Sequence, residues 1–76
     1  MTLDSGELAI VRNLTKRERE TLQWLAKGLS YRNIAIYMGV SVHSVRTWAQ
    51  TLHEKLGTHN QVQTVRRGYE LGVIEP

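Results

Sequence analysis

Apolar residues recur at helical spacing along most of the chain, most regularly between Ile34 and Leu56. When each residue after Ser41 is advanced by about 100°, the side chains separate into an apolar face and a polar face. This separation predicts an amphipathic helix from Ser41 to about Leu56. Its apolar face consists of Val42, Val45, Trp48, Ala49, Leu52 and Leu56, and its polar face of His43, Thr47, Gln50 and Glu54, with Arg46 at the edge.

The residues before this helix predict a helix-turn-helix, in which a short helix ends at Met38 and a tight turn follows at Gly39–Val40. Ala35 allows two helices to approach closely, and Gly39 can adopt the positive φ that a sharp turn between helices needs. Val45 is expected to pack under the turn.

Capping patterns mark the helices before the turn. Thr15 and Glu18 form a capping box, which predicts the start of a helix. This helix should end near Lys27, with Gly28 as its left-handed terminal residue. Ser30 is the expected N-cap of the short helix that precedes the turn.

A final helix is predicted after a stop at Gly57, with Asn60 as its N-cap and its end near Leu71. On this final helix, three apolar residues at successive spacings of three and four residues form one apolar stripe. The stripe could pack wholly against the helix that Thr15 starts, or part of it could be shared with a second copy of the chain. Its members are Val62, Val65 and Tyr69.

Residues 1–13 show no helical period, and their Thr, Asp, Ser and Gly residues predict a flexible lead or linker. Residues 14–76 are expected to form one domain. No alternating pattern predicts a strand. The expected fold class is therefore all-α, a four-helix bundle-like domain containing a helix-turn-helix.

The charge of the chain indicates a polyanionic partner. Its 76 residues fit one small domain and leave no room for a large catalytic pocket. Ten Lys and Arg against seven Asp and Glu give a net charge of +3. Residues 14–57 hold seven basic and three acidic residues, a net +4, and this segment contains the helix-turn-helix.

Other functions receive little support from the sequence. The chain has no cysteine, and no two of His43, His53 and His59 are four residues apart, so no metal or other cofactor is expected. No strand-to-helix turn is present to position a nucleophile, so we expect no enzyme. The absence of a signal-peptide pattern and of an apolar run of about 20 residues predicts a cytoplasmic protein without membrane contact.

The polar face of the helix after the turn carries groups that can read base edges in DNA. Arg46 can bridge O6 and N7 of guanine, Gln50 can bridge N6 and N7 of adenine, and the Thr47 methyl can meet a thymine methyl. His43 lies on the same face and is the fourth residue expected to read bases. The Glu54 carboxylate would be repelled by phosphates, so only the first two or three turns should enter a groove. Phosphate groups are expected at the helix starts, on Ser30, Arg32, Ser41 and Ser44.

The stretches LTKRERETLQWLAKGLSYRNIA, MGVSVHSVRTW and KLGTHNQVQTV resemble the LuxR/GerE-type DNA-binding domain of bacterial transcription regulators. The resemblance covers about residues 14–68 and includes the opening L-T-x-R-E-R-E and the K-L-G close. It implies a four-helix fold with the third helix in the major groove of double-stranded DNA. It also implies that Arg46, Thr47 and Gln50 face bases, and it makes RNA polymerase a further candidate partner.

Three positions depart from the family pattern. Asn33 stands where Glu is usual, which removes part of a capping box, Trp48 replaces a usual His, and Asn60–Gln61 stands where Asn-Arg or Ser-Arg is common. The resemblance further implies that the fourth helix is a dimer contact, which predicts a weak homodimer on DNA. The interface residues would be Val62, Val65, Arg66 and Tyr69.

Two alternatives stay open at this point. A sigma-factor region-four-like module shares the R-E-R start and a helix-turn-helix, although the K-L-G close and the fourth helix argue against it. A helical protein-interaction module could instead use the polar face to bind an acidic partner. Binding of DNA at that face would distinguish a DNA-binding domain of either kind from a protein-interaction module.

Overall fold

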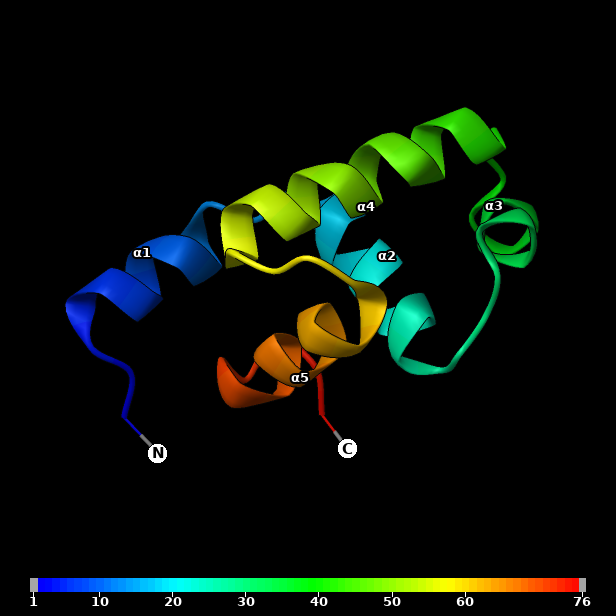
Figure 1. The fold of residues 1–76 in the computed structure, drawn as a ribbon. Coiled ribbons are helices and arrows are strands. Elements are labelled where there is room, and N and C mark those ends of the chain that lie inside the picture. Colours follow the sequence, from blue (N-terminus) through cyan, green and yellow to red (C-terminus); the bar gives the residue numbers. More distant parts are fainter. Residues whose placement is uncertain (1, 76) are drawn as a thin grey trace.

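The computed structural model describes residues 2–75, which form five α-helices and no strand (Figure 1). The prediction of an all-α fold with a helix-turn-helix is therefore confirmed. Met1, in the predicted lead, and Pro76, in the predicted domain, lie outside the described residues. No helix between residues 2 and 75 is long and apolar enough to cross a membrane. The helices are α1 (Ser5–Arg12), α2 (Lys16–Ala26), α3 (Tyr31–Met38), α4 (Val42–Leu56) and α5 (Gln61–Glu70).

The predicted caps explain where α2, α3, α4 and α5 begin. The Thr15 hydroxyl accepts a hydrogen bond from the Glu18 amide at 3.1 Å, and the Glu18 carboxylate accepts one from the Thr15 amide at 2.8 Å. Both halves of the capping box are thus present. Ser30, Ser41 and Asn60 each accept a hydrogen bond from the amide three residues later. The starts of all four helices are as predicted.

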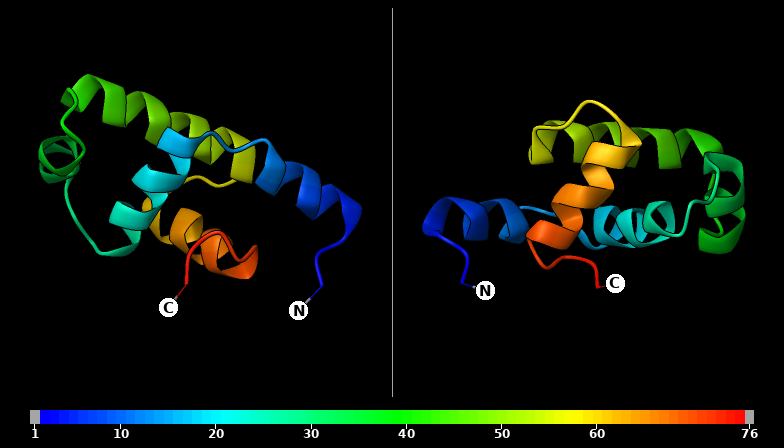
Figure 2. Two further views of the ribbon diagram at one scale, coloured as in Figure 1. Left: turned by 180° about the vertical axis from the view of Figure 1, so that it is seen from behind. Right: turned by 60° about the horizontal axis from the view of Figure 1, so that its bottom comes forward.

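The longest helix, α4, organises the packing. It packs against α2, α3 and α5, and α2 packs in turn against α5. Figures 1 and 2 show α4 lying across one side of the molecule, with α3 at its N-terminal end and α2 and α5 beneath it. One long side of α4 therefore carries no other helix. The buried apolar side chains are Leu14, Leu22, Leu25, Ile34, Ala35, Val45, Ala49, Leu52, Leu56, Leu71 and Ile74.

The helix α1 lies within residues 1–13, where the sequence predicts a flexible lead or linker, and adds a fifth helix to the four predicted. Asp4 is its N-cap and accepts a hydrogen bond from the Glu7 amide at 2.7 Å, while the Glu7 carboxylate accepts one from the Asp4 amide at 3.1 Å. This is a second capping box. The intervening Ser5–Gly6 pair is typical of loops and hides the D-x-x-E pattern in the sequence. No residue of α1 is fully buried, which explains its weak apolar period.

The helix α5 buries a different face from its apolar stripe. Thr64 and Gly68 are the buried residues of α5, whereas Val62 is 74% exposed and Tyr69 is 40% exposed. Val65 is half-buried and packs against the core. The stripe predicted from the sequence therefore lies mostly on the outside of the domain.

Small residues explain this orientation of α5. A Cβ at Gly68 would lie only 3.0 Å from the Leu22 side chain, so glycine allows α5 to approach α2 closely. The Thr64 hydroxyl donates to the Asn60 carbonyl at 2.9 Å and shares a hydrogen bond with the Thr58 hydroxyl at 2.6 Å. Both polar demands of a buried threonine are thus met.

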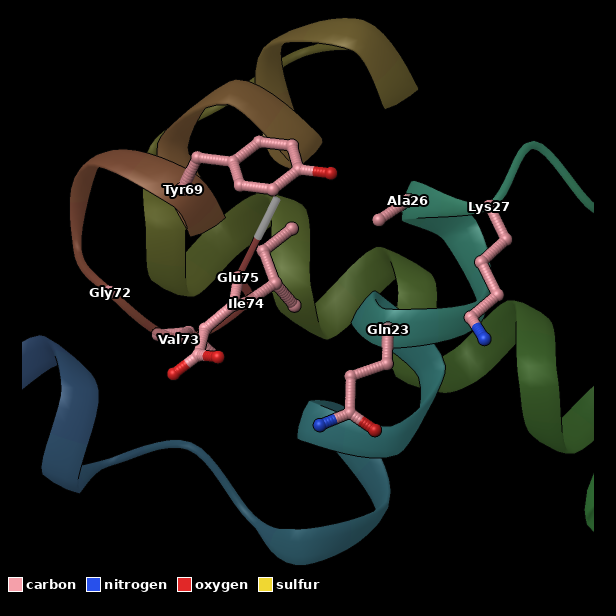
Figure 3. A pocket seen from close by; sticks show the side chains of 8 residues that line it. All are labelled: Gln23, Ala26, Lys27, Tyr69, Gly72, Val73, Ile74 and Glu75. Atoms are coloured by element: carbon pink, nitrogen blue, oxygen red, sulfur yellow. The ribbon is translucent and has the colours of Figure 1, made fainter.

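A hollow of about 640 Å³ lies between α2 and the C-terminal end of the chain. Figure 3 shows Tyr69 and Ile74 on one side of it. Across from them lie Gln23 of α2 and Lys27, which directly follows α2. None of the residues predicted to contact DNA lines this hollow. It belongs to the α5 side of the domain and is separate from the exposed face of α4.

Candidate nucleic-acid interface

The four side chains predicted to read bases lie on the exposed face of α4. His43, Arg46, Thr47 and Gln50 are all exposed, and Glu54 continues this face toward the C-terminal end of the helix. The opposite face of α4 is part of the core. It contributes Val45, Ala49, Leu52 and Leu56, each 5% exposed or less. The apolar face of α4 is therefore packed into the core, while its polar face stays accessible to solvent.

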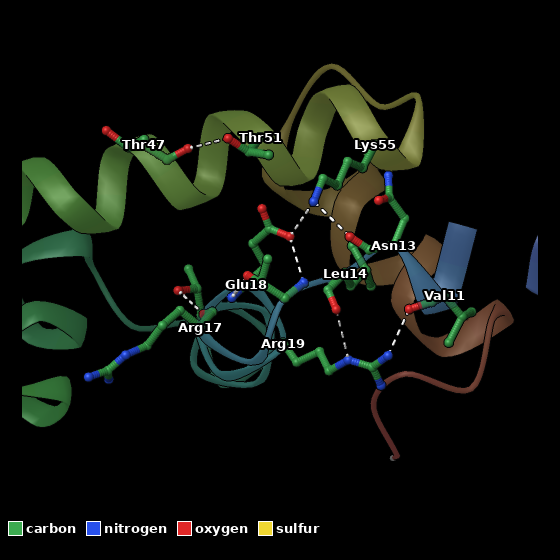
Figure 4. Close-up of polar contacts among 11 residues, drawn as sticks. Val11, Asn13, Leu14, Arg17, Glu18, Arg19, Thr47, Thr51 and Lys55 are labelled. Atoms are coloured by element: carbon green, nitrogen blue, oxygen red, sulfur yellow. Dashed lines mark hydrogen bonds and ion pairs between the residues drawn. The ribbon is translucent and has the colours of Figure 1, made fainter. Parts of the chain in front are cut away.

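The hydrogen bonds of this face show which groups are available to a ligand. Arg46 and Gln50 make no side-chain hydrogen bond or ion pair within the described part of the chain. The Thr47 hydroxyl instead donates to the His43 carbonyl at 3.1 Å, so this hydroxyl is already bonded within α4. Thr51 repeats this bond one turn later, donating to the Thr47 carbonyl at 2.9 Å (Figure 4).

The turn fixes α4 relative to α3. Gly39 has φ 68° and ψ 38°, in the left-handed region that the sequence predicts. The Val40 amide donates to the Ala35 carbonyl at 3.0 Å and closes the end of α3. Ala35 is 4% exposed and Val45 is fully buried. The expected packing under the turn is therefore present.

The residues predicted to bind phosphate form two groups. Ser41 accepts a hydrogen bond from the Ser44 amide at 3.1 Å and donates one to the Ser44 hydroxyl at 3.1 Å, so these two serines lie together at the start of α4. Ser30 and Arg32 lie at the start of α3, where the Ser30 hydroxyl accepts from the Asn33 amide at 3.2 Å and Arg32 is exposed. Amides and hydroxyls at both helix starts favour a negatively charged ligand.

An ion pair joins α2 to α4 away from the exposed face. Lys55 Nζ lies 2.8 Å from Glu18 Oε1 and also donates to the Asn13 carbonyl at 2.7 Å (Figure 4). Burial by itself raises the pKa of the Glu18 carboxyl. The hydrogen bond and charge of Lys55 and the bond from the Thr15 amide outweigh burial and hold this pKa below its ordinary value. Sequence patterns did not reveal this pair, because its members are 37 residues apart.

A second basic residue is used inside the domain. The Arg19 guanidinium donates to the Val11 carbonyl at 2.7 Å and to the Leu14 carbonyl at 3.4 Å, which ties the end of α1 to α2 (Figure 4). Of the seven basic residues in 14–57, Arg19 and Lys55 therefore make hydrogen bonds within the domain. The remaining five are exposed and place positive charge on the surface of the domain. They are Lys16, Arg17, Lys27, Arg32 and Arg46.

A family model described as bacterial regulatory proteins of the luxR family matches residues 12–67. The matched residues contain α2, α3, α4 and the turn, and so the whole helix-turn-helix. The chain belongs to this family. The DNA-binding regulator predicted from the sequence is thereby confirmed at the level of the family.

Curated relatives in the family are named as transcription regulators. Transcriptional activator protein EsaR of Pantoea stewartii subsp. stewartii is 39% identical over 62 residues, covering 82% of this chain and 25% of EsaR. Transcriptional activator protein YukR of Yersinia ruckeri is 36% identical over 63 residues, covering 83% and 28%. Transcriptional regulatory protein UhpA of Escherichia coli (strain K12) is 40% identical over 57 residues, covering 75% and 29%.

The chain thus corresponds to only 25% to 29% of the length of these relatives. No solved structure gives a significant match to it. The aligned stretch covers at least three quarters of this chain in each of the three relatives.

Proposed function

We propose that α4 enters the major groove of double-stranded DNA and reads its sequence for a transcription regulator that acts in the cytoplasm. One observation supports this most directly. The side chains suited to base edges all project from the exposed face of a helix whose other face is core. A major groove is wide enough to admit such a helix.

Each side chain on this face suits a particular base contact. The exposed Arg46 guanidinium can donate two parallel hydrogen bonds to guanine O6 and N7, and the Gln50 amide can pair with adenine N6 and N7. Because the Thr47 hydroxyl is bonded to the His43 carbonyl, its methyl group is the part that would meet a thymine methyl. His43, one turn before Thr47, would contact the base pair nearest the start of α4.

Phosphate contacts would hold this helix in register. Ser41 and Ser44 would meet one part of the sugar-phosphate backbone at the start of α4, and Ser30 and Arg32 another at the start of α3. Glu54 would remain outside the groove, since its carboxylate would be repelled by phosphates. Only about the first two or three turns of α4 are therefore expected to insert.

We further propose that α5 forms a weak homodimer on DNA. Val62, which is 74% exposed, and Tyr69, which is 40% exposed, lie on the outside of α5 with the half-buried Val65. Arg66 is exposed beside them. A narrow apolar patch of this kind supports weak pairing, strengthened when two half-sites bring two domains together.

Binding of a mixed-sequence duplex at low salt, followed by NMR, tests the proposed reading face. The backbone amides from His43 to Gln50 should shift on titration with DNA, while those of α1 should change little. An acidic peptide of matched charge is the control and should not reproduce the pattern. If the peptide shifts these amides and the duplex does not, the chain is a protein-interaction module and the proposed function is wrong.

A further inference from the structure

Arg17 and Trp48 form a contact between α2 and α4. The Arg17 guanidinium carbon lies 5.7 Å from the centroid of the Trp48 ring, within the range of a cation-π interaction. Arg17 comes from the first turn of α2 and Trp48 from the middle of α4. The Arg17 side chain is still 49% exposed. The Arg17 side chain therefore contacts α4 through Trp48 but remains accessible to solvent.

Arg17 has no structural task comparable to those of its basic neighbours. Arg19 is bonded to two backbone carbonyls, and Lys55 is bonded to a carbonyl and a buried carboxylate. Figure 4 shows Arg17 and Arg19 leaving α2 in opposite directions, Arg19 toward α1 and Arg17 away from it. The other partner of Arg17 is Glu20, three residues later, at 3.3 Å. Exposed pairs of this kind contribute little to stability.

The contact lies along one flank of α4. Ser44, Trp48 and Thr51 are half-buried, between the core face and the exposed face. The flank continues to Lys55, which contacts Glu18, so the first turns of α2 run beside it. The major groove is about 12 Å wide, and a helix with its side chains is about 10–12 Å across. A helix in the groove therefore brings its flanks close to the phosphates of the groove walls.

We propose that Arg17 binds a DNA phosphate and that Trp48 positions it to do so. This inference rests on the proposed insertion of α4 into the groove. The Ser44 contact lies one helical turn away on the same flank, and each DNA strand carries a phosphate for every 3.4 Å of its axis, so both residues can meet phosphates of one strand. Stacking on a ring leaves the N–H edges of a guanidinium free, and two of them can bind one phosphate.

The consequence is that α2 contributes to binding through a side chain outside the helix-turn-helix. The residue at position 48 then acts through Arg17 and makes no base contact of its own. Release of Arg17 from Glu20 on binding would cost little, because this ion pair is partly exposed.

The test measures how DNA affinity depends on salt for the whole chain and its variants. Arg17→Ala should weaken preferred and unrelated duplexes alike and reduce the log–log salt slope by about 0.9, the loss of one phosphate contact. Arg12→Ala is the matched control, because Arg12 is an exposed arginine on α1. It should leave the slope almost unchanged. Arg17→Lys should retain part of the affinity, since it keeps the charge without the planar guanidinium.

Positioning is tested with Trp48→Leu, which keeps an apolar side chain in the half-buried site but removes the ring, and with Trp48→Phe, which keeps a ring. Trp48→Leu should weaken binding in the wild-type chain but not further in Arg17→Ala, and Trp48→Phe should weaken it less. Circular dichroism melting confirms that each variant is folded at the assay temperature. Additive effects of Arg17→Ala and Trp48→Leu would overturn the positioning role.

Equal salt slopes for Arg17→Ala and Arg12→Ala would overturn the phosphate contact itself. That result would leave the proposed function intact if the wild-type chain still binds DNA in a salt-dependent way. Failure of the wild-type chain to bind any duplex would instead reject the proposed function, so the two failures are distinguishable.

Discussion

Gly39 shows how a single residue shapes the interface. Its φ of 68° and ψ of 38° let the chain reverse between α3 and α4, and the Val40 amide then reaches the Ala35 carbonyl. Apart from Gly39 and its two neighbours in the chain, no atom lies within 4 Å of the place where a Cβ would be. The constraint at this position is therefore the backbone conformation and not the available space.

Substitution of Gly39 measures that constraint. Gly39→Val should lower the free energy of unfolding by more than about 1 kcal/mol, because a β-branched residue is poorly tolerated at positive φ. Gly39→Asn should cost less, since asparagine adopts the left-handed region more readily. Urea and thermal unfolding of the three proteins provide the comparison. Equal stability of Gly39→Val and the wild type would show that the turn does not require this conformation.

At the scale of elements, the contact between Glu18 and Lys55 joins the start of α2 to the end of α4. The Glu18 side chain is 5% exposed and also completes the capping box of α2. Its pKa is lowered in the folded domain. A carboxyl group of this kind stabilises the fold at pH values above its unfolded pKa of about 4.3. The contribution disappears as the pH falls through the lower pKa of the folded state.

The pH dependence of unfolding tests this contact. Glu18→Gln should destabilise the domain at neutral pH by about 1–3 kcal/mol, because a neutral amide replaces the charged acceptor of the hydrogen bonds from Lys55 and Thr15. The difference from the wild type should shrink below about pH 4.3 as Glu18 becomes protonated in the wild type. Denaturant unfolding at several pH values gives both curves. Parallel curves down to strongly acid pH would contradict the lowered pKa.

Local signals explain which elements the sequence could predict. Thr15, Ser30, Ser41 and Asn60 each act within three residues along the chain, so the starts of four helices follow from short patterns. The same kind of signal starts α1, but Gly6 inside it resembles a loop residue. The inward face of α5 escaped prediction because Gly68 and Thr64 are not apolar. Gly68 is buried because α2 packs closely against it, and Thr64 can be buried because its hydroxyl bonds to the Asn60 carbonyl. The periodicity of apolar residues does not reveal either contact.

In the candidate site, too, some features follow from local sequence and others depend on how the helices pack. The exposure of Arg46, Thr47 and Gln50 follows from helical periodicity alone, because the core face of α4 is strongly apolar. The engagement of the Thr47 hydroxyl also follows from local structure, as it bonds to a carbonyl four residues earlier. The contact of Arg17 with Trp48 joins residues 31 positions apart. Such contacts depend on how α2 and α4 pack, so they require the structure.

For the whole molecule, the distribution of charge predicts how binding responds to salt. Two of the seven basic residues in 14–57 are used internally, and the others are exposed. If about four to six phosphates are neutralised per domain, the log–log slope of affinity against salt should be roughly −4 to −5. Fluorescence anisotropy with a labelled duplex across a salt series measures it. A slope near zero would contradict binding through phosphates.

The assembly of two domains is a separate prediction at this scale. The chain should sediment as a monomer at micromolar concentration and pair on DNA whose half-sites lie about one helical turn apart. Val62→Glu should weaken paired binding without lowering stability, because Val62 is 74% exposed. Leu8→Glu, on α1, is the control and should bind as the wild type does. Equal affinity for all half-site spacings would indicate that the chain binds DNA as a monomer.

In the proposed complex, α4 reads bases while other residues bind phosphate. After selection of a preferred site from a random duplex pool, the affinities of three variants for that site and for unrelated duplex separate these roles. Arg32→Ala should weaken both alike and reduce the salt slope by about one. Glu54→Gln should keep the sequence preference and bind slightly tighter.

Arg46→Ala gives the most direct measurement. It should cost roughly 1–3 kcal/mol on the preferred site and much less on unrelated duplex, and specificity should relax at one base pair, because the lost hydrogen bonds go to a base edge. An equal loss of affinity for preferred and unrelated duplex would contradict this account, since it would make Arg46 a phosphate contact and remove the arginine from the reading face of α4.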